Sequence, residues 1–379
     1  MTLSQINIAV RKSVLDLVVR KQASLQPPDR QLASALIWFK NSLRESGGSS
    51  AKFCLATQRY SPAYPETTGY WINTLCDVRT HYPDIMHSVF ASREIEMELA
   101  GWLQSIQRDD GAFPGSYGDL DRQPPVVFNT GQILHGLIAV VRYAGNDANL
   151  FDSIVRASKW LVSVQEPDGA WRRNSRCQLS SNTRTAWALI LAGRLLSDDS
   201  YVDAGRRNVT YALTHLNERF YFTSNGFRSD RPAFTHTIAY AIEGMLACGI
   251  LESKSAWIDA AENAYDALLP YVASDGRLAG EFGESFESDD SYVCLTGNCQ
   301  LAAIGFQLHE VRGNRVHLDN ANRLLDFVRR HQLTSRSAGV DGGIPGSWPL
   351  KGRYNPYKVP NWAVKFFVDA LIAHDRSGE

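Results

Sequence analysis

Two residues that can transfer protons lie four positions apart in a largely apolar segment, "THTIAYAIEG", which holds His236 and Tyr240. The apolar run predicts a helix that begins near these residues. Side chains four apart share one helix face, so both can reach a single ligand. Histidine and tyrosine are frequent general acids and bases. We take the pair as candidate catalytic groups, with hydrogen-bonded core residues as the alternative.

A charged residue lies at the start of another apolar helix. Arg184 stands early in "NTRTAWAL", where an unpaired buried charge would be very costly. We therefore expect an anionic partner for Arg184, either a ligand or a carboxylate such as Glu66 or Asp289. Glu66 precedes a third helix start of the same kind, "TTGYW". Glu66 and Arg184 complete the candidate catalytic set with His236 and Tyr240.

These helix starts form an internal repeat of about 60 residues. The repeated segments are "TTGYWINTL", "NTGQILHGL", "NTRTAWALI", "HTIAYAIEGM", "LTGNCQLAAIG" and "NWAVKFFVDAL". Amphipathic segments such as "DSIVRASKWLVSVQ" lie between them and carry their charges on one face, which indicates outer helices around buried inner ones. The repeat predicts an all-α fold, an (α/α)6 toroid of six helical hairpins over residues 29–379. Residues 1–28 are expected to form an N-terminal helical extension.

A closed ring would bring all six inner helix starts to one face, the mouth. We expect Thr or Asn at each N-cap, and we expect the long Gly-, Pro- and Asp-rich loops on the same face. Six helix N-termini there would favour an anionic or hydroxyl-rich ligand. Glu66, Asn129, Arg184, His236 and Tyr240 should then converge on one pocket. The predicted binding residues around them are Asn129, Gln132, Asn182, Tyr70, Trp71, Asn298, Gln300, Asn361, Lys365 and Trp348.

The repeats and the strings "FNTGQ", "NTRTAWAL", "CLTGNCQLA" and "GGIPGSWP" resemble the alpha/alpha six-hairpin toroid superfamily of glycosidases, uronate-polysaccharide lyases and epimerases. More closely, they resemble bacterial proteins that accompany polysaccharide-assembly genes. The resemblance implies a carbohydrate-active enzyme acting on an oligo- or polysaccharide that contains uronate. In toroidal uronate lyases Asn, Arg or His binds the sugar carboxylate, and His or Tyr moves the proton.

Applied to this chain, Asn129 and Arg184 would neutralise the carboxylate, since a C5 proton is otherwise too weakly acidic at neutral pH. His236 or Tyr240 would then remove that proton. Returning it from the opposite face gives a C5-epimerase, and losing the C4 oxygen gives a lyase. The sequence does not separate these outcomes.

Three other interpretations remain open. A glycoside hydrolase would need two carboxyl groups, and the mouth-side candidates are Glu66, Glu281, Glu284, Asp289 and Asp290. A non-catalytic glycan-binding or scaffold protein of polysaccharide biosynthesis would use the same polar mouth. A terpenoid cyclase or prenyltransferase-like toroid is suggested by "QEPDGAW" at 165–171, in which we interpret Gln165 and Trp171 as braces between outer helices.

Composition narrows the function classes. The net charge is −1 and shows no basic footprint for nucleic acid. The sequence lacks an apolar run long enough for a membrane span, so we expect a cytoplasmic protein, although the segment 6–19 would suit peripheral membrane association. The six cysteines show no CxxC pair, and no phosphate-binding loop, dinucleotide fingerprint or metal triad is visible. We therefore expect no cofactor and no metal; the oligomeric state is left open.

Overall fold

The computed structural model describes residues 8–9, 11–13, 15, 24–145, 147–175 and 179–378. Most of the predicted N-terminal extension, residues 1–28, lies outside these ranges, and so does Cys177. The five described cysteines are free thiols, four of them buried. No helix of the described residues is both long and apolar enough to cross a membrane.

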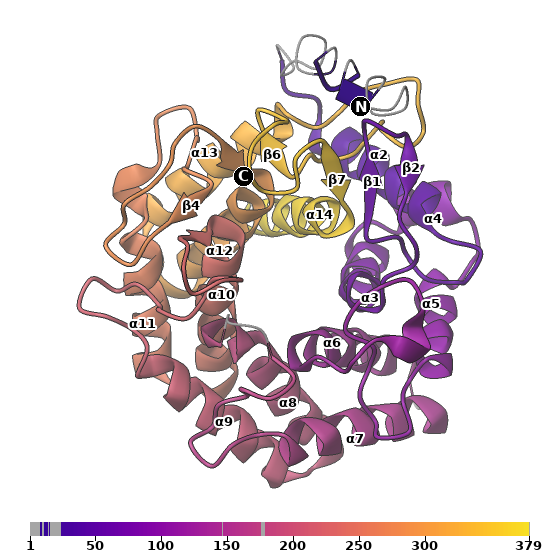
Figure 1. Cartoon of the computed structure of the whole chain (residues 1–379), viewed down its shortest axis with the longest axis vertical. Coiled ribbons are helices and arrows are strands. Elements are labelled where there is room, and N and C mark those ends of the chain that lie inside the picture. The colour runs from indigo at the N-terminus through magenta and orange to yellow at the C-terminus, as the bar shows by residue number, and fades with distance from the viewer. Residues whose placement is uncertain are drawn as a thin grey trace.

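Outer and inner helices alternate along the chain from residue 28 onwards. The outer helices are α2 (Pro28–Ser42), α5 (Ile95–Ser105), α7 (Ala148–Ser163), α9 (Asp199–Leu213), α11 (Ser255–Asp266) and α13 (Arg315–Arg329). The inner helices are α3 (Pro65–His81), α6 (Val127–Ala144), α8 (Thr183–Leu196), α10 (Thr235–Glu252), α12 (Leu295–Arg312) and α14 (Asn361–Arg376). Each inner helix contacts the next, and α14 contacts α3, which closes the ring seen in Figure 1. The predicted (α/α)6 toroid is thus confirmed; a further short helix, α4 (Pro83–Phe90), follows α3.

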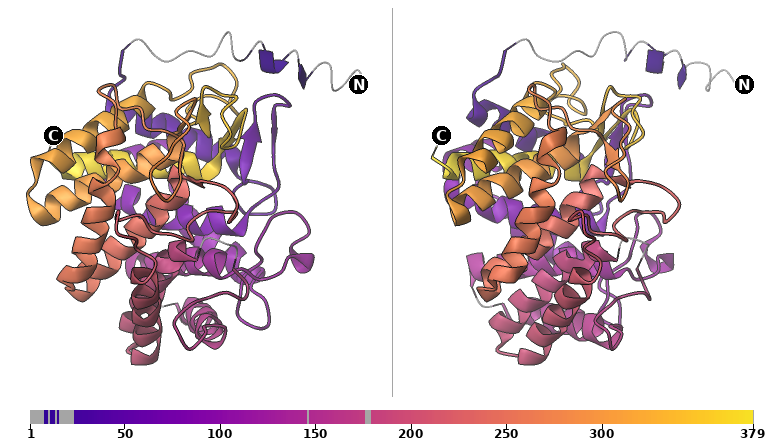
Figure 2. Two further views of the ribbon diagram at one scale, coloured as in Figure 1. Left: turned by 60° about the vertical axis from the view of Figure 1, so that its left-hand side comes forward. Right: turned by 90° about the vertical axis from the view of Figure 1, so that its left-hand side faces the viewer.

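The loops that enter the inner helices carry short antiparallel strands. Strand β1 (Lys52–Cys54) pairs with β2 (Arg59–Tyr60) and with β7 (Lys358–Pro360), so that Phe53 lies opposite both Tyr60 and Val359. Strand β3 (Ala233–Phe234) pairs with β4 (Glu281–Phe282), and β5 (Val293–Cys294) pairs with β6 (Ser347–Trp348). Short 3₁₀ turns lie at Leu120–Arg122, Ser180–Asn182 and Leu269–Tyr271. Figure 2 shows these strands and long loops gathered on one face of the ring, opposite the short return turns.

The repeated helix starts hold neighbouring inner helices very close together. A Cβ atom on Gly69 of α3 would lie 2.6 Å from the Cα of Ile133 on α6. On Gly244 of α10 it would lie 2.5 Å from the backbone nitrogen of Arg184 on α8, and on Gly297 of α12 it would lie 2.8 Å from the backbone nitrogen of His236. Real Cβ atoms do not approach backbone so closely. The glycines of the repeat are therefore contact points between inner helices.

The expected capping by Thr or Asn side chains is wrong: Asn182 precedes α8 without a capping hydrogen bond, and Asn361 is the first residue inside α14. The residues that precede the six inner helices make no side-chain capping hydrogen bond. Threonines of the repeat lie inside the first turn instead, where their hydroxyls donate to preceding carbonyls: Thr68 to Tyr64 at 2.9 Å and Thr237 to Phe234 at 3.0 Å. A short hydroxyl in that position reaches the carbonyl three or four residues earlier more readily than an amide ahead of it.

A glutamine brace recurs between outer helices. Gln165 donates to the carbonyls of Gly169, 3.1 Å away, and Ala204, 2.8 Å away, while Gln107 makes the equivalent bonds to Gly111 and Ser153. These contacts confirm the bracing role of Gln165.

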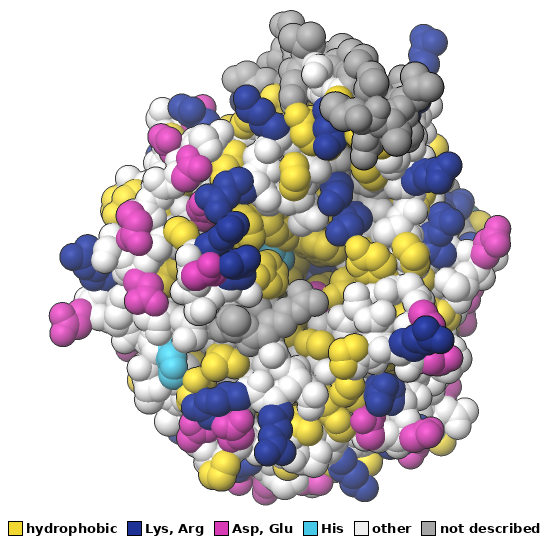
Figure 3. All heavy atoms as spheres, in the orientation of Figure 1, with side chains coloured by type: hydrophobic (Ala, Val, Ile, Leu, Met, Phe, Trp, Pro, Cys, Tyr) yellow, Lys and Arg dark blue, Asp and Glu magenta, His cyan; other side chains and the backbone are white. Residues whose placement is uncertain are grey.

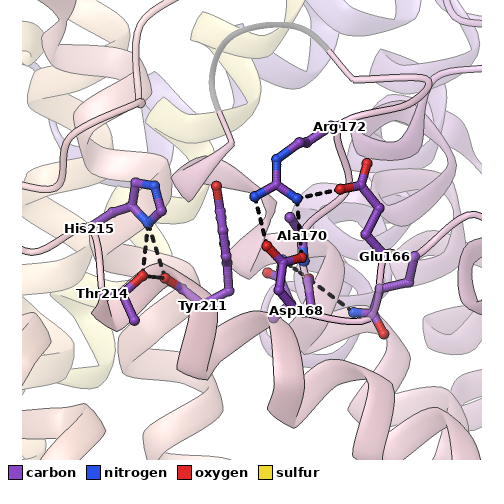
Figure 4. A network of polar contacts seen from close by, with 10 residues as sticks. Glu166, Asp168, Ala170, Arg172, Tyr211, Thr214 and His215 are labelled. Atoms are coloured by element: carbon purple, nitrogen blue, oxygen red, sulfur yellow. Dashed lines mark hydrogen bonds and ion pairs between the residues drawn. The ribbon is translucent and has the colours of Figure 1, made fainter.

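Ion pairs stabilise the turn that follows Gln165. Arg172 forms ion pairs with Glu166 and with Asp168, the latter at 2.7 Å, and its guanidinium lies 5.3 Å from the ring centroid of Tyr211 (Figure 4). Trp171 is fully buried and donates to the carbonyl of Leu161 at 2.8 Å, as a bracing residue would.

Adding a methyl group at a helix contact should open the ring. We expect Gly69→Ala to lower the free energy of unfolding by about 2 kcal/mol, because the added carbon meets the backbone of α6 rather than a flexible side chain. Gly101→Ala in the outer helix α5 is the matched control, since nothing lies within 4 Å of its Cβ position. It should stabilise the protein by up to about 1 kcal/mol. Urea unfolding of both variants tests the prediction, and equal effects would contradict it.

Candidate functional site

Side chains from opposite sides of the ring meet on its axis. The hydroxyls of Tyr70 on α3 and Tyr240 on α10 are 2.7 Å apart, although these two helices are three positions apart in a ring of six and so face each other. The rings of Phe366 on α14 and Phe128 on α6 pack against Tyr240, with centroids 6.0 and 4.8 Å away. We call Tyr70, Phe128, Tyr240 and Phe366 the axial layer. It lies between two cavities that open on opposite faces.

The first cavity, the mouth pocket, lies at the N-terminal ends of the inner helices and has a volume of about 130 Å³. Figure 3 shows the molecule hollowed at the centre of this face, with hydrophobic side chains around the hollow. The residues that line the pocket are Tyr64, Glu66, Val126, Phe128, Asn129, Phe227, His236, Tyr240, Tyr354, Asn355 and Trp362. Aromatic walls around a few polar groups are typical of a small-molecule site.

His236 is held as a neutral ring with one nitrogen fixed. Its Nδ1 lies 2.6 Å from Oε1 of Gln300 on α12, an atom that can only accept, so Nδ1 donates and Nε2 keeps its lone pair. The side chain is buried, and burial lowers the pKa of His236 to about 3, with the charge of Arg184 acting in the same direction. His236 can therefore accept a proton at Nε2 from a ligand in the mouth pocket.

Glu66 belongs to a short hydrogen-bonded chain across α3 and α6. The hydroxyl of Tyr64 donates to Oε2 of Glu66, and Nδ2 of Asn129 donates to the Tyr64 hydroxyl at 3.1 Å. Burial raises the pKa of Tyr240 well above its usual value, and the negative charge of Glu66 raises it further. Tyr240 is thus a proton donor, not a phenolate base. The mouth pocket accordingly holds a carboxyl group and a neutral imidazole on opposite inner helices.

The second cavity, the axial cavity, lies on the other side of the axial layer and has a volume of about 490 Å³. Arg184 lines this cavity, not the mouth pocket. It forms an ion pair with Glu243 on α10, and its Nε donates to Oε1 of Gln132 at 3.0 Å. Of the five residues expected to converge, Glu66, Asn129, His236 and Tyr240 line the mouth pocket, and Arg184 does not. Its anionic partner is Glu243, in place of Glu66 or Asp289.

The position of Arg184 follows from a stagger between helices. The first residue of α8, Thr183, packs against Gly244, which lies in the third turn of α10, and its hydroxyl donates to the carbonyl of Ala241 at 3.2 Å. Helix α8 therefore begins deeper in the ring than α10. Arg184, in the first turn of α8, thus enters the barrel below the axial layer, although it lies near the start of its inner helix as the mouth residues do in theirs.

Most of the other predicted binding residues hold the ring and its loops together. The indole of Trp71 is fully buried and donates to Oδ1 of Asn361, whose Nδ2 donates to Ser42 and to the carbonyl of Ser50. Asn298 donates to the carbonyl of Gly276 at 2.9 Å. These residues lie behind the walls of the mouth pocket.

The remaining members of the predicted set are also outside that pocket. Asn182 donates to Ser175 at 3.3 Å, and Trp348 packs on the ring of His331. Tyr70 and Lys365 line the axial cavity. Gln132 and Gln300 contact Arg184 and His236 rather than either opening.

The loop carboxylates do not form a pair with Glu66. Glu281 is buried in an ion pair with Arg353 and accepts from Tyr292 at 3.0 Å, whereas Asp289 is half-buried and accepts from the backbone of Ser291. Among the residues that the structure describes, Glu66 is the carboxylate that lines the mouth pocket. The two-carboxylate arrangement of a typical glycoside hydrolase is therefore not seen at this pocket.

Three aromatic residues that line the pocket, Phe128, Phe227 and Trp362, are outside the predicted set. Trp362 donates from Nε1 to the hydroxyl of Tyr354 at 2.6 Å, which forms one wall, and Phe128 and Phe227 supply two more. Trp362 and Phe128 adjoin the polar residues Asn361 and Asn129 in the sequence, so their place beside a repeated helix start was an available signal.

No protein-family model and no curated protein sequence matches this chain. Solved structures match over nearly its whole length. An unsaturated glucuronyl hydrolase specific for heparin has a TM-score of 0.71 and 14% identity, covering 92% of this chain and 97% of the other. D-mannose isomerase has a TM-score of 0.69 and 10% identity over 92% and 97% of the two chains. Cellobiose 2-epimerase from Bacillus thermoamylovorans has a TM-score of 0.69 and 11% identity over 90% and 97%. At these identities the similarity establishes the six-hairpin toroid fold.

The ion pair below the axial layer should matter for stability. We expect Arg184→Met to lower the free energy of unfolding by about 3 kcal/mol, because it leaves Glu243 and Gln132 without their partner in a largely buried site. The double variant Arg184→Met/Glu243→Gln should recover part of that loss, since the stranded charge is gone. A double-mutant cycle from urea unfolding measures the coupling. Strictly additive losses would show that the two residues do not depend on each other.

Proposed function

We propose that this chain is a carbohydrate-active enzyme that removes and returns a proton at a sugar carbon in the mouth pocket. The structures that share its fold are named as a glucuronyl hydrolase, a mannose isomerase and a cellobiose epimerase, all of which act on sugars. The aromatic walls formed by Tyr64, Phe128, Tyr354 and Trp362 offer surfaces on which sugar rings stack. The small volume suits a single sugar unit.

The observation that carries the proposal is the opposed placement of His236 and Glu66. They stand on α10 and α3, which face each other across the ring, and both line the pocket. Inversion at a carbon requires proton removal on one face and proton delivery on the other, so two opposed groups fit an epimerase. In a lyase, the second group would instead protonate the departing oxygen.

The substrate class follows from the chemistry of the proton. A ring proton can be removed when a neighbouring carboxyl or carbonyl group takes up the charge as an enolate, which suits C5 of a uronate. Asn129 and protonated Tyr240 can donate hydrogen bonds to that charge. A bound carboxylate would also raise the low pKa of His236 toward a value useful for a base. Arg184, below the axial layer, takes no direct part.

Solvent deuterium exchange tests the reaction. In heavy water, uronate oligosaccharides should gain deuterium at C5 if the enzyme is an epimerase, and an unsaturated product should absorb in the ultraviolet if it is a lyase. Mannose and cellobiose should be included, because deuterium at C2 would place the reaction at a reducing-end carbonyl instead. Binding without any exchange or elimination would favour a non-catalytic role.

Substitution of the two proposed proton-transfer groups should affect kcat, whereas substitution of residues behind the pocket wall should affect stability. We expect His236→Gln and Glu66→Gln each to lower kcat by about 10²- to 10⁴-fold with little change in unfolding temperature. Asn298→Ala, which removes a contact behind the pocket wall, is the matched control and should change stability more than kcat. Activity that survives in His236→Gln would exclude the imidazole as the base.

The dependence of kcat/KM on pH should show no fall caused by protonation of His236. Because burial places the pKa of free His236 near 3, the ring is already neutral at pH 5, and kcat/KM should not fall between pH 7.5 and 5.5 on its account. A fall with a midpoint near 6.5 that disappears in His236→Gln would contradict the buried, neutral ring. Measurements must be restricted to pH values at which the protein remains folded.

A further inference from the structure

The axial cavity contains more acidic than basic groups. Within it, Glu243 pairs with Arg184, and Lys365 pairs with Asp369, which also accepts from the hydroxyl of Thr74 at 2.6 Å. One more carboxylate, Asp77 of α3, lines the same cavity. With Glu310 and Arg376 at the edge, the lining holds four carboxylates and three Lys or Arg cations, so that one negative charge is left over when the lining histidines are counted as neutral.

Asp77 is the group that carries the excess charge. Its side chain is exposed to the cavity, and no hydrogen bond or ion pair joins it to any residue that the structure describes. Burial among surrounding protein and the negative charge of Asp369 raise the pKa of Asp77 to about 6, although the charges of Lys365, His81 and Arg376 act in the opposite direction. A carboxylate in such surroundings gains from a cation brought in by a ligand.

Charges at the edge of the cavity do not change this balance. Glu310 of α12 and Arg376 of α14 both line it and are both exposed, and their charges cancel. The C-terminal ends of the inner helices also point to this face, and their carbonyl groups carry partial negative charge that favours cations. The electrostatic potential in the axial cavity should thus be negative, whereas the helix N-termini at the mouth favour a positive potential there.

The other lining groups suit a ligand with hydroxyls. Asn73, one turn before Asp77, and Gln307 of α12 offer amide donors and acceptors, and the ring of Trp187 provides an apolar surface. Sugar hydroxyls bind through such planar polar groups, while sugar faces pack on aromatic rings. A volume of about 490 Å³ is within the range of ligand sites.

We propose that the axial cavity is a second ligand site, separate from the mouth pocket, that binds an amino sugar with a free ammonium group, the ammonium pairing with Asp77. The ligand supplies the missing positive charge, and its hydroxyls contact Asn73 and Gln307. The axial layer keeps this ligand apart from His236 and Glu66. This site does not depend on the reaction proposed for the mouth pocket.

Calorimetry on the full chain at pH 7 tests the site with glucosamine as the probe. Glucosamine should bind, whereas glucose and N-acetylglucosamine, which lack the positive charge, should bind at least tenfold more weakly. Asp77→Asn should weaken glucosamine binding at least tenfold. Equal binding of glucose, or no binding of glucosamine to the unmodified protein, would overturn the proposal.

Two control variants locate the ligand. Asp84→Asn, which removes an exposed carboxylate of α4 outside both cavities, should leave glucosamine binding unchanged. His236→Gln should also leave it unchanged, because that residue lines the other pocket. Loss of binding in His236→Gln but not in Asp77→Asn would place the amine in the mouth pocket and contradict the proposal. Magnesium that displaces glucosamine from the unmodified protein would indicate a metal site instead.

Discussion

The close contact between neighbouring inner helices is the constraint on which the rest of this structure depends. Glycines of the repeated segments let α3 meet α6, α8 meet α10 and α10 meet α12 without a side chain between them; Gly69 and Gly297 lie near the starts of their helices, and Gly244 lies in the third turn of α10. Helices packed so tightly enclose a narrow barrel. Side chains from opposite helices therefore touch on the axis, as the hydroxyls of Tyr70 and Tyr240 do. A wider ring would leave an open channel there.

The axial layer turns one barrel into two environments. On the side of the helix N-termini, the walls are aromatic, and the polar groups are a neutral imidazole, a carboxyl group and a phenol. On the side of the C-termini, ion pairs dominate, with Arg184 bonded to Glu243 and Lys365 to Asp369. Arg184 contacts both the axial layer and the ion pairs. Its guanidinium lies 5.3 Å from the ring centroid of Tyr240, and its charge is paired with Glu243 in the axial cavity. The barrel thus holds two chemically distinct cavities that share a single wall.

The sequence predicts the ring well because its signals are local. Apolar and amphipathic helices alternate with a period of about 60 residues, and each pair can be recognised alone. The mouth residues Glu66, Asn129, His236 and Tyr240 follow from the same period. The position of Arg184 does not follow from the period, because the stagger that places the start of α8 deeper in the ring depends on contacts such as that of Thr183 with Gly244. Trp71 and Asn361 were misplaced for a related reason: a side chain near a helix start can turn inward to the pocket or backward to a loop.

The glutamine brace also closes the ring. Gln332 donates to the carbonyl of Gln31, and Nε of Arg329 donates to Oε1 of the same glutamine, so the last hairpin is tied to the first. During synthesis on the ribosome, these partners are separated by almost the whole chain. Until α13 and α14 have emerged, the apolar flanks of α12 and α3 have nothing to cover them. Closure of the ring therefore depends on long-range contacts, which are slow to form, and an incomplete chain that lacks them leaves apolar surface uncovered and prone to association with other copies.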